Sequence, residues 1–457
     1  MNTNVDTYYF LGIGGIGMSA LARYFAAKGN RVLGYDRTPS PITEALTQEG
    51  IEIQYDDCLD RVKSLDSAKT IVVRTPAVPS DMAIYVWLKE NGFVLLKRAE
   101  VLGLVTRSER ALCVAGTHGK TTTSTLLAHI LHQSHLGTNA FLGGIANNYG
   151  TNLLLDKSNH VVVEADEFDR SFHHLTPYMS VITSIDPDHL DIYGSEEAYR
   201  ESFEKYATLV DHTIILKHGL ELKVSNLRAK VYRYAVDGIA DFHAENIHIL
   251  DGEIWFDFHT PKHVIENIQL GVPVWINIEN SVAAMAVAWL LGTTDDELRD
   301  GVRTFSGVYR RFNTHVSTPQ VSYIDDYAHH PIELKACVDS VRKLYPDRYI
   351  IGVFQPHLFS RTKDFADDFA SVLSDLDEVA LLPIYPAREK PIEGVTSDWL
   401  LEKITIKRAL VLPEILAKYL RERVKHCIKK GKACTVITMG AGDIDRRVNE
   451  IQKALTL

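Results

Sequence analysis

Two glycine-rich loops, each placed between an apolar run and an amphipathic segment, constrain the fold of this chain more than any other feature. The first is GIGGIG at residues 12–17, after the run TYYFL, and the second is GTHGKTTTS at residues 116–124, after the run ALCVA. Where a strand leads through such a loop into a helix, backbone N–H groups and the positive end of the helix bind phosphate oxygens. The sequence therefore predicts two phosphorylated ligands, held by separate α/β units.

Apolar runs of strand length alternate with amphipathic segments of helix length along most of the chain, which is typical of parallel sheets with helical crossovers. A second α/β unit begins with ALCVAGT and a third with VSYIDDYAHHP, while residues 212–275 are richer in strands and include the predicted hairpin FHAENIHILDGEIWFDFHT. At about 100 to 200 residues per domain, 457 residues suit several domains. We predict an α/β protein with three domains, at residues 1–107, 108–315 and 316–457.

The composition excludes several classes of protein. Apolar residues at 46% and charged residues at 24% are ordinary for a globular chain, and a net charge of -10 argues against binding to nucleic acid. Five cysteines without a CxxC pair favour a reducing compartment over a disulfide framework or a zinc ribbon. Since no segment resembles a signal peptide or an 18-residue apolar span, we expect a cytoplasmic protein without a membrane partner.

The loop at residues 116–124 has the short pattern GTxGKT rather than a full Walker A motif, because Val114 stands where a glycine is required. Gly119 lets the backbone approach a ligand, Lys120 would reach the terminal phosphates of a nucleotide, and Thr121 would ligate magnesium. A glycine turn capped by threonines is the structural alternative. The other loop residues expected to line the nucleotide are Gly116, Thr117, His118 and Thr122.

The loop at residues 12–17 matches G-x-G-x-x-G through Gly12, Gly14 and Gly17, and Asp36 follows nineteen residues after Gly17. In a dinucleotide-binding domain an acidic residue at this distance binds the ribose, which favours a nicotinamide cofactor. The same loop also suits any diphosphate at a helix N-terminus, and a tight structural turn is the third possibility. The motif alone leaves these alternatives open.

Carboxylates follow two further predicted strands of the second unit. Glu164 comes directly after HVVV, and the segment DPDHLDIYG, with His189 among its aspartates, follows MSVITSI. The carboxyl ends of parallel strands form the usual mouth of an α/β site. Carboxylate oxygens suit magnesium better than an imidazole does, and a solvated helix cap remains the alternative for each residue.

Eight motifs taken in order resemble those of the Mur ligases. They extend from residue 10 to about residue 444 and are GIGGIGMSALA, AGTHGKTTTS, EADEFDRSF, DPDHLDIYG, RRFNTH, DDYAHHPIEL, FQPHLFSRT and GAGDI. The resemblance implies an N-terminal Rossmann-like domain for a UDP-sugar, a central P-loop ATPase domain and a C-terminal Rossmann-like domain that helps to bind ATP and an amino acid. It is strongest to the members that use ATP and Mg²⁺ to join L-alanine to UDP-N-acetylmuramate in peptidoglycan precursor synthesis.

The family's motifs, matched position by position, also imply catalytic roles. Lys120 is the P-loop lysine, Thr121 and Glu164 lie at a first magnesium, and His189 lies at a second magnesium near the substrate carboxylate. Arg311 reaches the ATP phosphates. An amide bond forms through an acyl phosphate, and either His189 or His329 could deprotonate the incoming amine, since histidine titrates near neutral pH.

The same matching implies binding residues. Asp326 would meet the ribose of ATP, and Asn277 and Asn280 would contact the adenine, although Ile276 replaces the histidine that the family carries beside them. The glycine loop would hold the UDP diphosphate rather than a nicotinamide cofactor. The residues assigned to the amino acid are Tyr327, His329 and Arg361, and those assigned to the UDP-sugar are Gly12, Gly14, Gly15, Gly17, Met18, Ser19 and Asp36.

Two further positions depart from the family pattern. Leu358 stands where many relatives carry an arginine, and Glu204 stands where other Mur ligases carry a carbamylated lysine, so we expect no such modification there. Three alternative functions remain. They are the related recycling ligase that adds a whole tripeptide, an NAD-dependent dehydrogenase with an accessory ATP domain, and a non-catalytic ATP-driven switch. Either a monomer or a homodimer suits the sequence.

Overall fold

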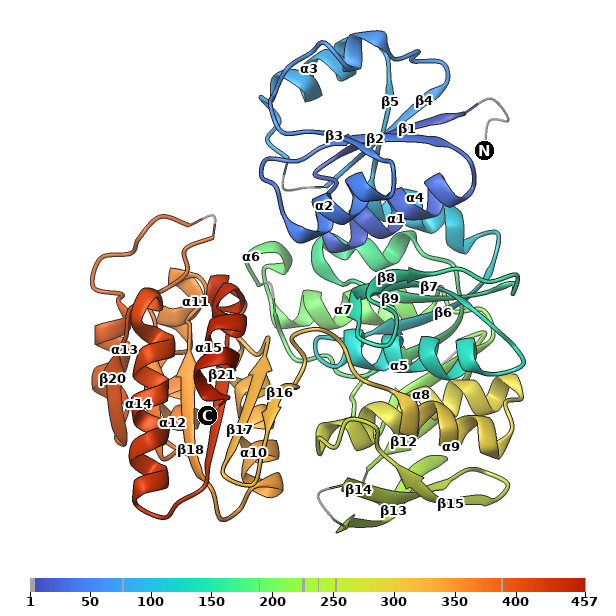
Figure 1. Cartoon of the computed structure of the whole chain (residues 1–457). Coiled ribbons are helices and arrows are strands. Elements are labelled where there is room, and N and C mark those ends of the chain that lie inside the picture. Colours follow the sequence, from blue (N-terminus) through green and yellow to red (C-terminus); the bar gives the residue numbers. More distant parts are fainter. Residues whose placement is uncertain are drawn as a thin grey trace. The chain divides into compact units, whose positions relative to one another are not determined.

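A computed structural model of the chain describes residues 5–75, 78–188, 190–223, 227–236, 238–250, 253–387 and 389–456. Its strands form three separate sheets, with helices along their faces (Figure 1). Residues Met1–His248, Trp255–Gly271 and Ile278–Ser306 form one compact unit, and Ile249–Ile254, Val272–Asn277 and Gly307–Leu457 form a second. The predicted α/β class with three domains is confirmed.

The first sheet is parallel and has the order β3-β2-β1-β4-β5. All five residues of the central strand β1 are buried, as expected for a parallel strand covered on both faces. Its strands are β1 (Thr7–Leu11), β2 (Arg31–Tyr35), β3 (Glu52–Gln54), β4 (Thr70–Arg74) and β5 (Val94–Lys97). Its helices are α1 (Ile16–Ala27), α2 (Pro41–Gln48), η1 (Val62–Ser64), α3 (Ala83–Glu90) and α4 (Arg98–Thr106).

The second sheet has ten strands in the order β15-β14-β13-β12-β11-β10-β6-β9-β7-β8. Its centre is parallel, while β7 with β8 and β14 with β15 are antiparallel pairs at its edges. Its strands are β6 (Arg110–Ala115), β7 (Asn139–Ala146), β8 (Thr151–Leu154), β9 (His160–Ala165), β10 (Pro177–Ile182), β11 (Thr213–Lys217), β12 (Lys230–Ala235), β13 (Phe242–Leu250), β14 (Glu253–His259) and β15 (Val264–Gln269). Its helices are α5 (Lys120–Gln133), η2 (Phe168–His174), α6 (Leu190–Tyr193), α7 (Glu196–Ala207), α8 (Ile276–Leu291) and α9 (Asp295–Thr304).

The third sheet has the order β16-β17-β21-β18-β19-β20 and is parallel apart from the edge strand β16. Its strands are β16 (Asn313–Ser317), β17 (Val321–Asp326), β18 (Tyr349–Phe354), β19 (Glu378–Leu381), β20 (Lys407–Leu410) and β21 (Cys434–Met439). Its helices are α10 (Pro331–Leu344), α11 (Phe359–Asp364), α12 (Ala366–Leu373), α13 (Ser397–Lys403), η3 (Pro413–Ile415), α14 (Leu416–Lys429), η4 (Asp443–Arg447) and α15 (Val448–Leu455).

Several sequence predictions can be compared directly with these elements. The strands β13 and β14 are neighbours, as the hairpin pattern predicts, but the Asp251–Gly252 turn lies outside the described residues. The predicted boundary between residues 315 and 316 falls within β16, which pairs with β17 in the third sheet.

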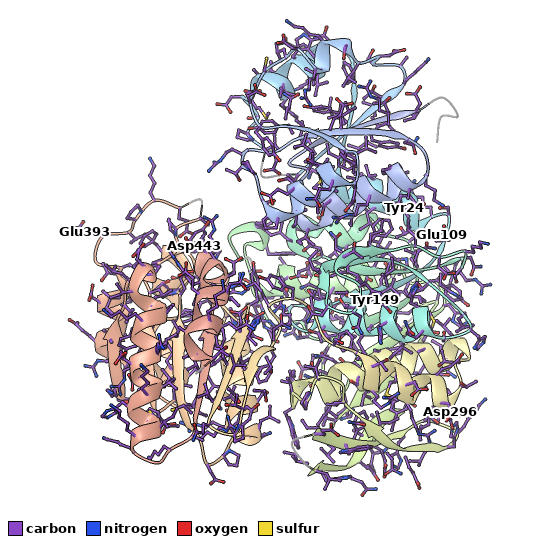
Figure 2. All side chains as sticks on the ribbon, viewed as in Figure 1. Tyr24, Glu109, Tyr149, Asp296, Glu393 and Asp443 are labelled. Carbon is purple, nitrogen blue, oxygen red and sulfur yellow. The ribbon has the colours of Figure 1, made fainter. Side chains whose placement is uncertain are left out.

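Apolar side chains of the first two sheets meet in one continuous core cluster of the first unit. Tyr24 on α1, for example, has its ring 5.2 Å from that of Phe141 on β7 (Figure 2). All five cysteines are free thiols. In the described part of the chain, no helix combines the length and the apolar content that crossing a membrane requires.

Candidate functional site

The loop between β6 and α5 has the backbone that its glycines predict. Gly116 and Gly119 have φ angles of +139° and +80°, in the region that glycine adopts without strain. A Cβ atom on Gly116 would lie 2.1 Å from Oγ1 of Thr183, so no larger residue fits there. Helix α5 begins at Lys120, directly after the loop, which directs the free N–H groups of its first turn toward the loop.

Lys120 forms a buried ion pair with Glu167, a residue that the sequence analysis did not single out. Its Nζ atom lies 2.8 Å from Oε2 of Glu167 and donates to the backbone oxygens of Gly116 and Thr117. The two side chains are only 13% and 4% exposed. Burial opposes the charge on Lys120, but the carboxylates of Glu167 and Glu164 outweigh it and raise the lysine pKa. Burial raises the pKa of Glu167 to about 7, although Lys120 opposes the shift.

Glu164 lies at the end of β9, beside the strand that leads into the phosphate loop. In the β6–β9 pairing it is opposite Val114, two residues before Gly116. A Cβ atom on Gly143 would lie 2.0 Å from Oε2 of Glu164, so the glycine leaves the space that this carboxylate occupies. Thr121, in the first turn of α5, is almost fully buried.

Glu164 and Thr121 offer oxygen donors, which are the ligands that Mg²⁺ prefers. These residues therefore fit a magnesium ion beside the loop. The third predicted metal ligand, His189, lies outside the described residues.

The remaining residues of the loop are tied to the segment that follows β10. The hydroxyl of Thr117 donates to the backbone oxygen of Asp186 over 2.7 Å, and the backbone N–H of His118 donates to Oγ of Ser184 over 2.8 Å. Thr122 follows in the first turn of α5 and is partly buried. Contacts with the segment after β10 therefore hold Thr117 and His118 in place.

The two asparagines assigned to the adenine lie in the first turns of α8 and have different partners. Asn280 accepts a hydrogen bond from Oγ1 of Thr123 on α5 over 3.1 Å, so it is in contact with the phosphate-loop helix. Asn277 belongs to the second compact unit, where its side chain donates to the backbone oxygen of Val272. The exposed Ile276 precedes it.

In the glycine loop after β1, Asp36 holds the loop itself. The backbone N–H of Gly14 donates to Oδ2 of Asp36 over 2.7 Å. Gly12 has a φ angle of +83°, and a Cβ atom on Gly17 would lie 2.8 Å from Nη1 of Arg98. Gly15 is the N-cap of α1, so the loop opens on a helix N-terminus as a phosphate site requires.

Met18 and Ser19 lie on the inner side of α1 rather than at the surface of the loop. Both are buried, and the Ser19 hydroxyl donates to the backbone of Ile16 and accepts from Asn152 on β8. Arg98 connects the glycine loop with the second sheet, because its Nη2 atom lies 2.9 Å from Oδ2 of Asp166, the residue directly after β9. Sequence reasoning missed both members of this ion pair, although Asp166 lies within the quoted EADEFDRSF motif.

In the second unit, the adjacent arginines of the RRF motif have different environments. Arg310 is 9% exposed, and its guanidinium donates to the backbone oxygens of Gly440 and Gly442. Arg311 is 32% exposed, and its Nη1 atom lies 4.0 Å from Oε1 of Glu333. Arg311, to which the motif match assigns the ATP phosphates, is therefore the more exposed of the two arginines.

Asp326, Tyr327 and His329 lie together after β17. Asp326 accepts backbone N–H donors from Phe312 and Ala328, and burial raises its pKa to about 6 against the opposing charge of Arg311. The guanidinium of Arg311 lies 5.1 Å from the centre of the Tyr327 ring. Four of the predicted residues are thus within one neighbourhood of this unit.

The Nδ1 atom of His329 faces two oxygens, the backbone oxygen of Tyr327 and, 3.2 Å away, Oε2 of Glu333. Its Nδ1 atom lies 3.0 Å from the backbone oxygen of Tyr327, which leaves Nε2 as the acceptor if Nδ1 carries the proton. Burial lowers its pKa, partly opposed by Glu333, and the charge of Arg361 on α11 lowers it further. Arg361 therefore lies within electrostatic reach of His329, as the assignment of both to one substrate requires.

Leu358, the residue that replaces an arginine of many relatives, precedes α11 with a φ angle of +71°. This conformation is rare for residues other than glycine and is costly for a branched side chain. Its backbone N–H donates to the oxygen of Tyr385, which helps to hold it.

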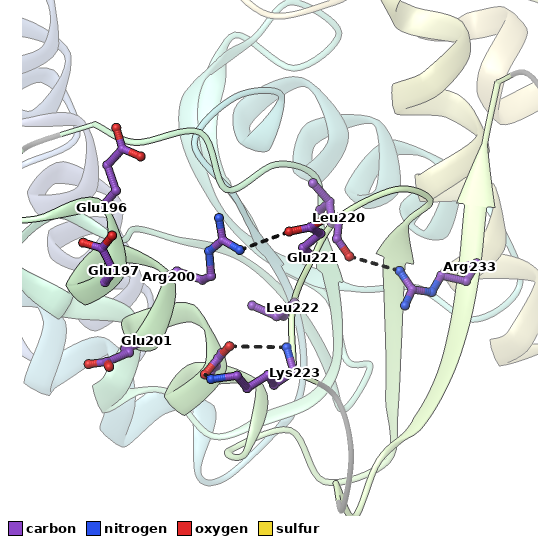
Figure 3. A pocket seen from close by; sticks show the side chains of 10 residues that line it. Glu196, Glu197, Arg200, Glu201, Leu220, Glu221, Leu222, Lys223 and Arg233 are labelled. Carbon is purple, nitrogen blue, oxygen red and sulfur yellow. Dashed lines mark hydrogen bonds and ion pairs between the residues drawn. The ribbon is translucent and has the colours of Figure 1, made fainter.

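A cavity of about 710 Å³ lies between α7 and the segment after β11 (Figure 3). Glu204 lines it, and one of its oxygens lies 3.9 Å from Nζ of Lys223. Arg200, which also lies on α7, pairs with Glu221 of the segment after β11 over 3.4 Å. Position 204 thus carries an acidic group that is already paired with a cation.

Three family descriptions match successive parts of the chain. They are the Mur ligase family catalytic domain at residues 7–110, the Mur ligase middle domain at residues 114–288 and the Mur ligase glutamate ligase domain at residues 310–442. Together with the two glycine loops, they define an enzyme of three α/β parts. The chain belongs to the Mur ligase family.

Two relatives that match over the full length carry the same name. The UDP-N-acetylmuramate–L-alanine ligase of Parabacteroides distasonis is 54% identical over 99% of this chain and 97% of its own, and that of Christiangramia forsetii is 45% identical over 99% and 98%. Among solved structures, the UDP-N-acetylmuramate–alanine ligase of Thermotoga maritima has a TM-score of 0.81 at 26% identity, covering 98% of each chain.

Proposed function

We propose that this protein joins L-alanine to the carboxylate of UDP-N-acetylmuramate at the expense of ATP, releasing ADP and phosphate. The observation that carries this proposal is the full-length similarity to relatives of that name, at 54% identity over 99% of the chain. A murein peptide ligase from Psychrobacter arcticus shares the fold at 22% identity and a TM-score of 0.67. The alanine reaction is therefore favoured over tripeptide addition.

The substrate acid needs activation, because a carboxylate would have to expel an oxide as its leaving group. Transfer of the γ-phosphate of ATP to this carboxylate gives an acyl phosphate, in which phosphate becomes the leaving group. The amine of alanine then attacks the acyl carbon, and the tetrahedral intermediate collapses to an amide and phosphate. The sugar carboxylate and the γ-phosphate both carry negative charge, so the protein must neutralise their repulsion.

Lys120 and Arg311 are the cations that we assign to this task. Lys120 is held at the loop by Glu167 and two backbone oxygens, and phosphate oxygens would replace part of this set. Thr121 and Glu164 would hold Mg²⁺, which when bound neutralises charge on the phosphate oxygens. Asp326, Asn277, Asn280 and the loop residues 116–122 would complete the ATP site.

The amine of alanine must lose a proton before or during its attack. His329 suits this role, because burial lowers the pKa of its imidazole, and Nε2 is the acceptor when Nδ1 carries the proton toward the backbone oxygen of Tyr327. Tyr327 and Arg361 are its proposed partners in binding the amino acid. His189 remains a second candidate for this proton.

The glycine loop of residues 12–17 is proposed to bind the diphosphate of the UDP-sugar. The N-terminus of α1, which begins at Ile16 within the loop, suits a dianion. Asp36 already accepts the backbone N–H groups of Gly14 and Thr38, one on each carboxylate oxygen. Its role in the proposed UDP-sugar site is therefore to hold the loop in shape.

We also propose the division at residues 1–107, 108–315 and 316–457, a cytoplasmic location, and either a monomer or a homodimer. The three parts would bind the UDP-sugar, ATP, and ATP together with the amino acid. Their closure would exclude the water that otherwise hydrolyses an acyl phosphate.

A product-resolved assay tests the proposal. The protein is incubated with ATP, Mg²⁺ and UDP-N-acetylmuramate, together with L-alanine, the tripeptide or no amino acid, and ADP and the new amide are measured. We expect ADP and the amide to form in equal amounts when L-alanine is the added amino acid, and neither to form in the other two reactions. Amide formation with only the tripeptide would assign the recycling reaction, ADP without amide would assign an ATP-driven switch, and oxidation of added NADH would assign a dehydrogenase.

A further inference from the structure

Two histidines and a glutamate meet on one face of the second sheet, on its neighbouring strands β13 and β14. On β13, Phe242 and Ala244 are buried, and the alternate residues His243 and Glu245 lie on the opposite face. On the neighbouring strand β14, Phe256 and Phe258 are buried and His259 alternates with them. The pleat of two adjacent strands therefore brings the three polar side chains to the same face.

The spacing of their polar atoms suits a tetrahedral metal ion. One ligand atom from each residue lies within 4.8 Å of the others. Nε2 of His243 lies 3.3 Å from Oε1 of Glu245, and Nε2 of His259 lies 3.2 Å from Oε2. For zinc bonds of 2.0–2.1 Å in a tetrahedron, neighbouring ligand atoms lie about 3.4 Å apart. Each separation is close to this edge length, with one oxygen of the Glu245 carboxylate facing each imidazole.

Neighbouring contacts hold the ligand atoms in place. Nδ1 of His243 lies 2.9 Å from the backbone oxygen of Ala240, the arrangement that orients a ligating imidazole and leaves the Nε2 lone pair for a metal. Asn246 donates to Oδ2 of Asp257 over 2.6 Å and so ties β13 to β14 beside the cluster. The two histidine rings stack with centres 4.5 Å apart.

We propose that His243, Glu245 and His259 bind one Zn²⁺ ion. Two imidazoles and one carboxylate are ligands typical of zinc, whereas Mg²⁺ prefers oxygen alone. The three protein ligands leave a fourth position for water. Because the ligands come from two strands, the ion would clamp β13 to β14 and stabilise this part of the sheet. The site is independent of the proposed reaction.

Direct metal binding tests the site. Full-length chain without a histidine tag is freed of metal with a chelator, and Zn²⁺ is titrated in competition with a chromophoric chelator. His259→Gln and Glu245→Gln each remove one ligand on this face of the sheet. His263→Gln is the matched control, since its imidazole pairs with the single carboxylate of Asp295 at 3.1 Å. Circular dichroism checks that each variant is folded.

We expect one tight Zn²⁺ per chain, bound equally by the parent and His263→Gln. Loss of a ligand should weaken binding by more than the roughly 10- to 100-fold that loss of a supporting hydrogen bond costs. Zinc should also raise the thermal midpoint of the parent and the control, but not that of His259→Gln. The proposal is overturned if the parent binds no zinc, or if both ligand variants bind it as tightly as the parent does.

Discussion

The proposed magnesium site depends on the absence of a side chain at Gly143, and this dependence can be tested with one methyl group. In Gly143→Ala, the new Cβ atom would lie 2.0 Å from Oε2 and 2.4 Å from Cδ of Glu164. Cβ contacts under 3.0 Å essentially never occur, so the oxygen must move by at least 3.0 − 2.0 = 1.0 Å. Gly143 is not among the glycines with a positive φ, so alanine adds no backbone strain.

A shift of this size should impair the reaction far more than the fold. Mg²⁺ demands near-ideal octahedral geometry with short bonds, and a misplacement of about 1 Å can cost about 100-fold in rate. We therefore expect kcat of Gly143→Ala to fall by about 100-fold, which is about 2.7 kcal/mol in the activation barrier. The Mg²⁺ concentration for half-maximal rate should rise. The assay measures ADP and amide formation across a range of Mg²⁺ concentrations.

A double-mutant cycle distinguishes this steric effect from a general defect. Glu164→Asp shortens the side chain by one methylene and withdraws its carboxylate from position 143. If the methyl group acts by displacing the carboxylate, the double variant Gly143→Ala/Glu164→Asp should lose little more than Glu164→Asp alone. Unchanged kcat in Gly143→Ala, or losses that simply multiply in the double variant, would refute the reasoning.

Four further outcomes follow from the sites described above. Lys120→Ala should lower kcat by about 10³-fold or more while UDP-sugar binding, measured by calorimetry, stays intact; unchanged turnover would remove Lys120 from the mechanism. The raised pKa of Glu167, about 7 against an ordinary 4.5, means that the folded chain retains a proton which the unfolded chain releases. Its contribution to stability is therefore present below pH 4.5 and is lost as the pH rises to about 7. In protein without nucleotide, the thermal midpoint of Glu167→Gln should therefore change less than that of the parent between these two pH values. Arg310→Ala, which leaves the buried Asp325 carboxylate without its cation, should cost about 3 to 5 kcal/mol of stability, whereas Arg311→Ala should keep the thermal midpoint and lose turnover; the reverse result would exchange their roles. His329→Gln should lower kcat by about 10²- to 10⁴-fold and remove the acidic limb of the pH–rate profile, and a limb that persists would assign the proton to another group.

Much of the fold was predictable because its local signals agree. The run TYYFL, its glycine loop and the following helix match β1 and α1, and the start of α5 at Lys120 follows directly from GKT. The edge strands were harder. The residues of β16, NTHVS, are mostly polar and only one is buried, so they carry no apolar pattern. This strand exists because β17 offers an unpaired edge, which local sequence does not reveal.

The carboxylates of EADEFD show where sequence reasoning stops. Glu164, Asp166 and Glu167 are all acidic residues of one short motif, and the motif match assigns a role only to Glu164. In the structure their tasks differ: Glu164 fills the space beside Gly143, Asp166 pairs with Arg98, and Glu167 is buried against Lys120.

Each of these partners lies at least 21 residues away in the sequence, so no local pattern identifies it. Glu167 and Asp166 therefore link the phosphate-loop lysine with the arginine beside the first glycine loop through two adjacent residues of one segment. If a bound phosphate replaces Glu167 as the partner of Lys120, the segment that carries Glu167 and Asp166 would be expected to move. The two proposed phosphate sites would then be coupled through η2 and the residues before it.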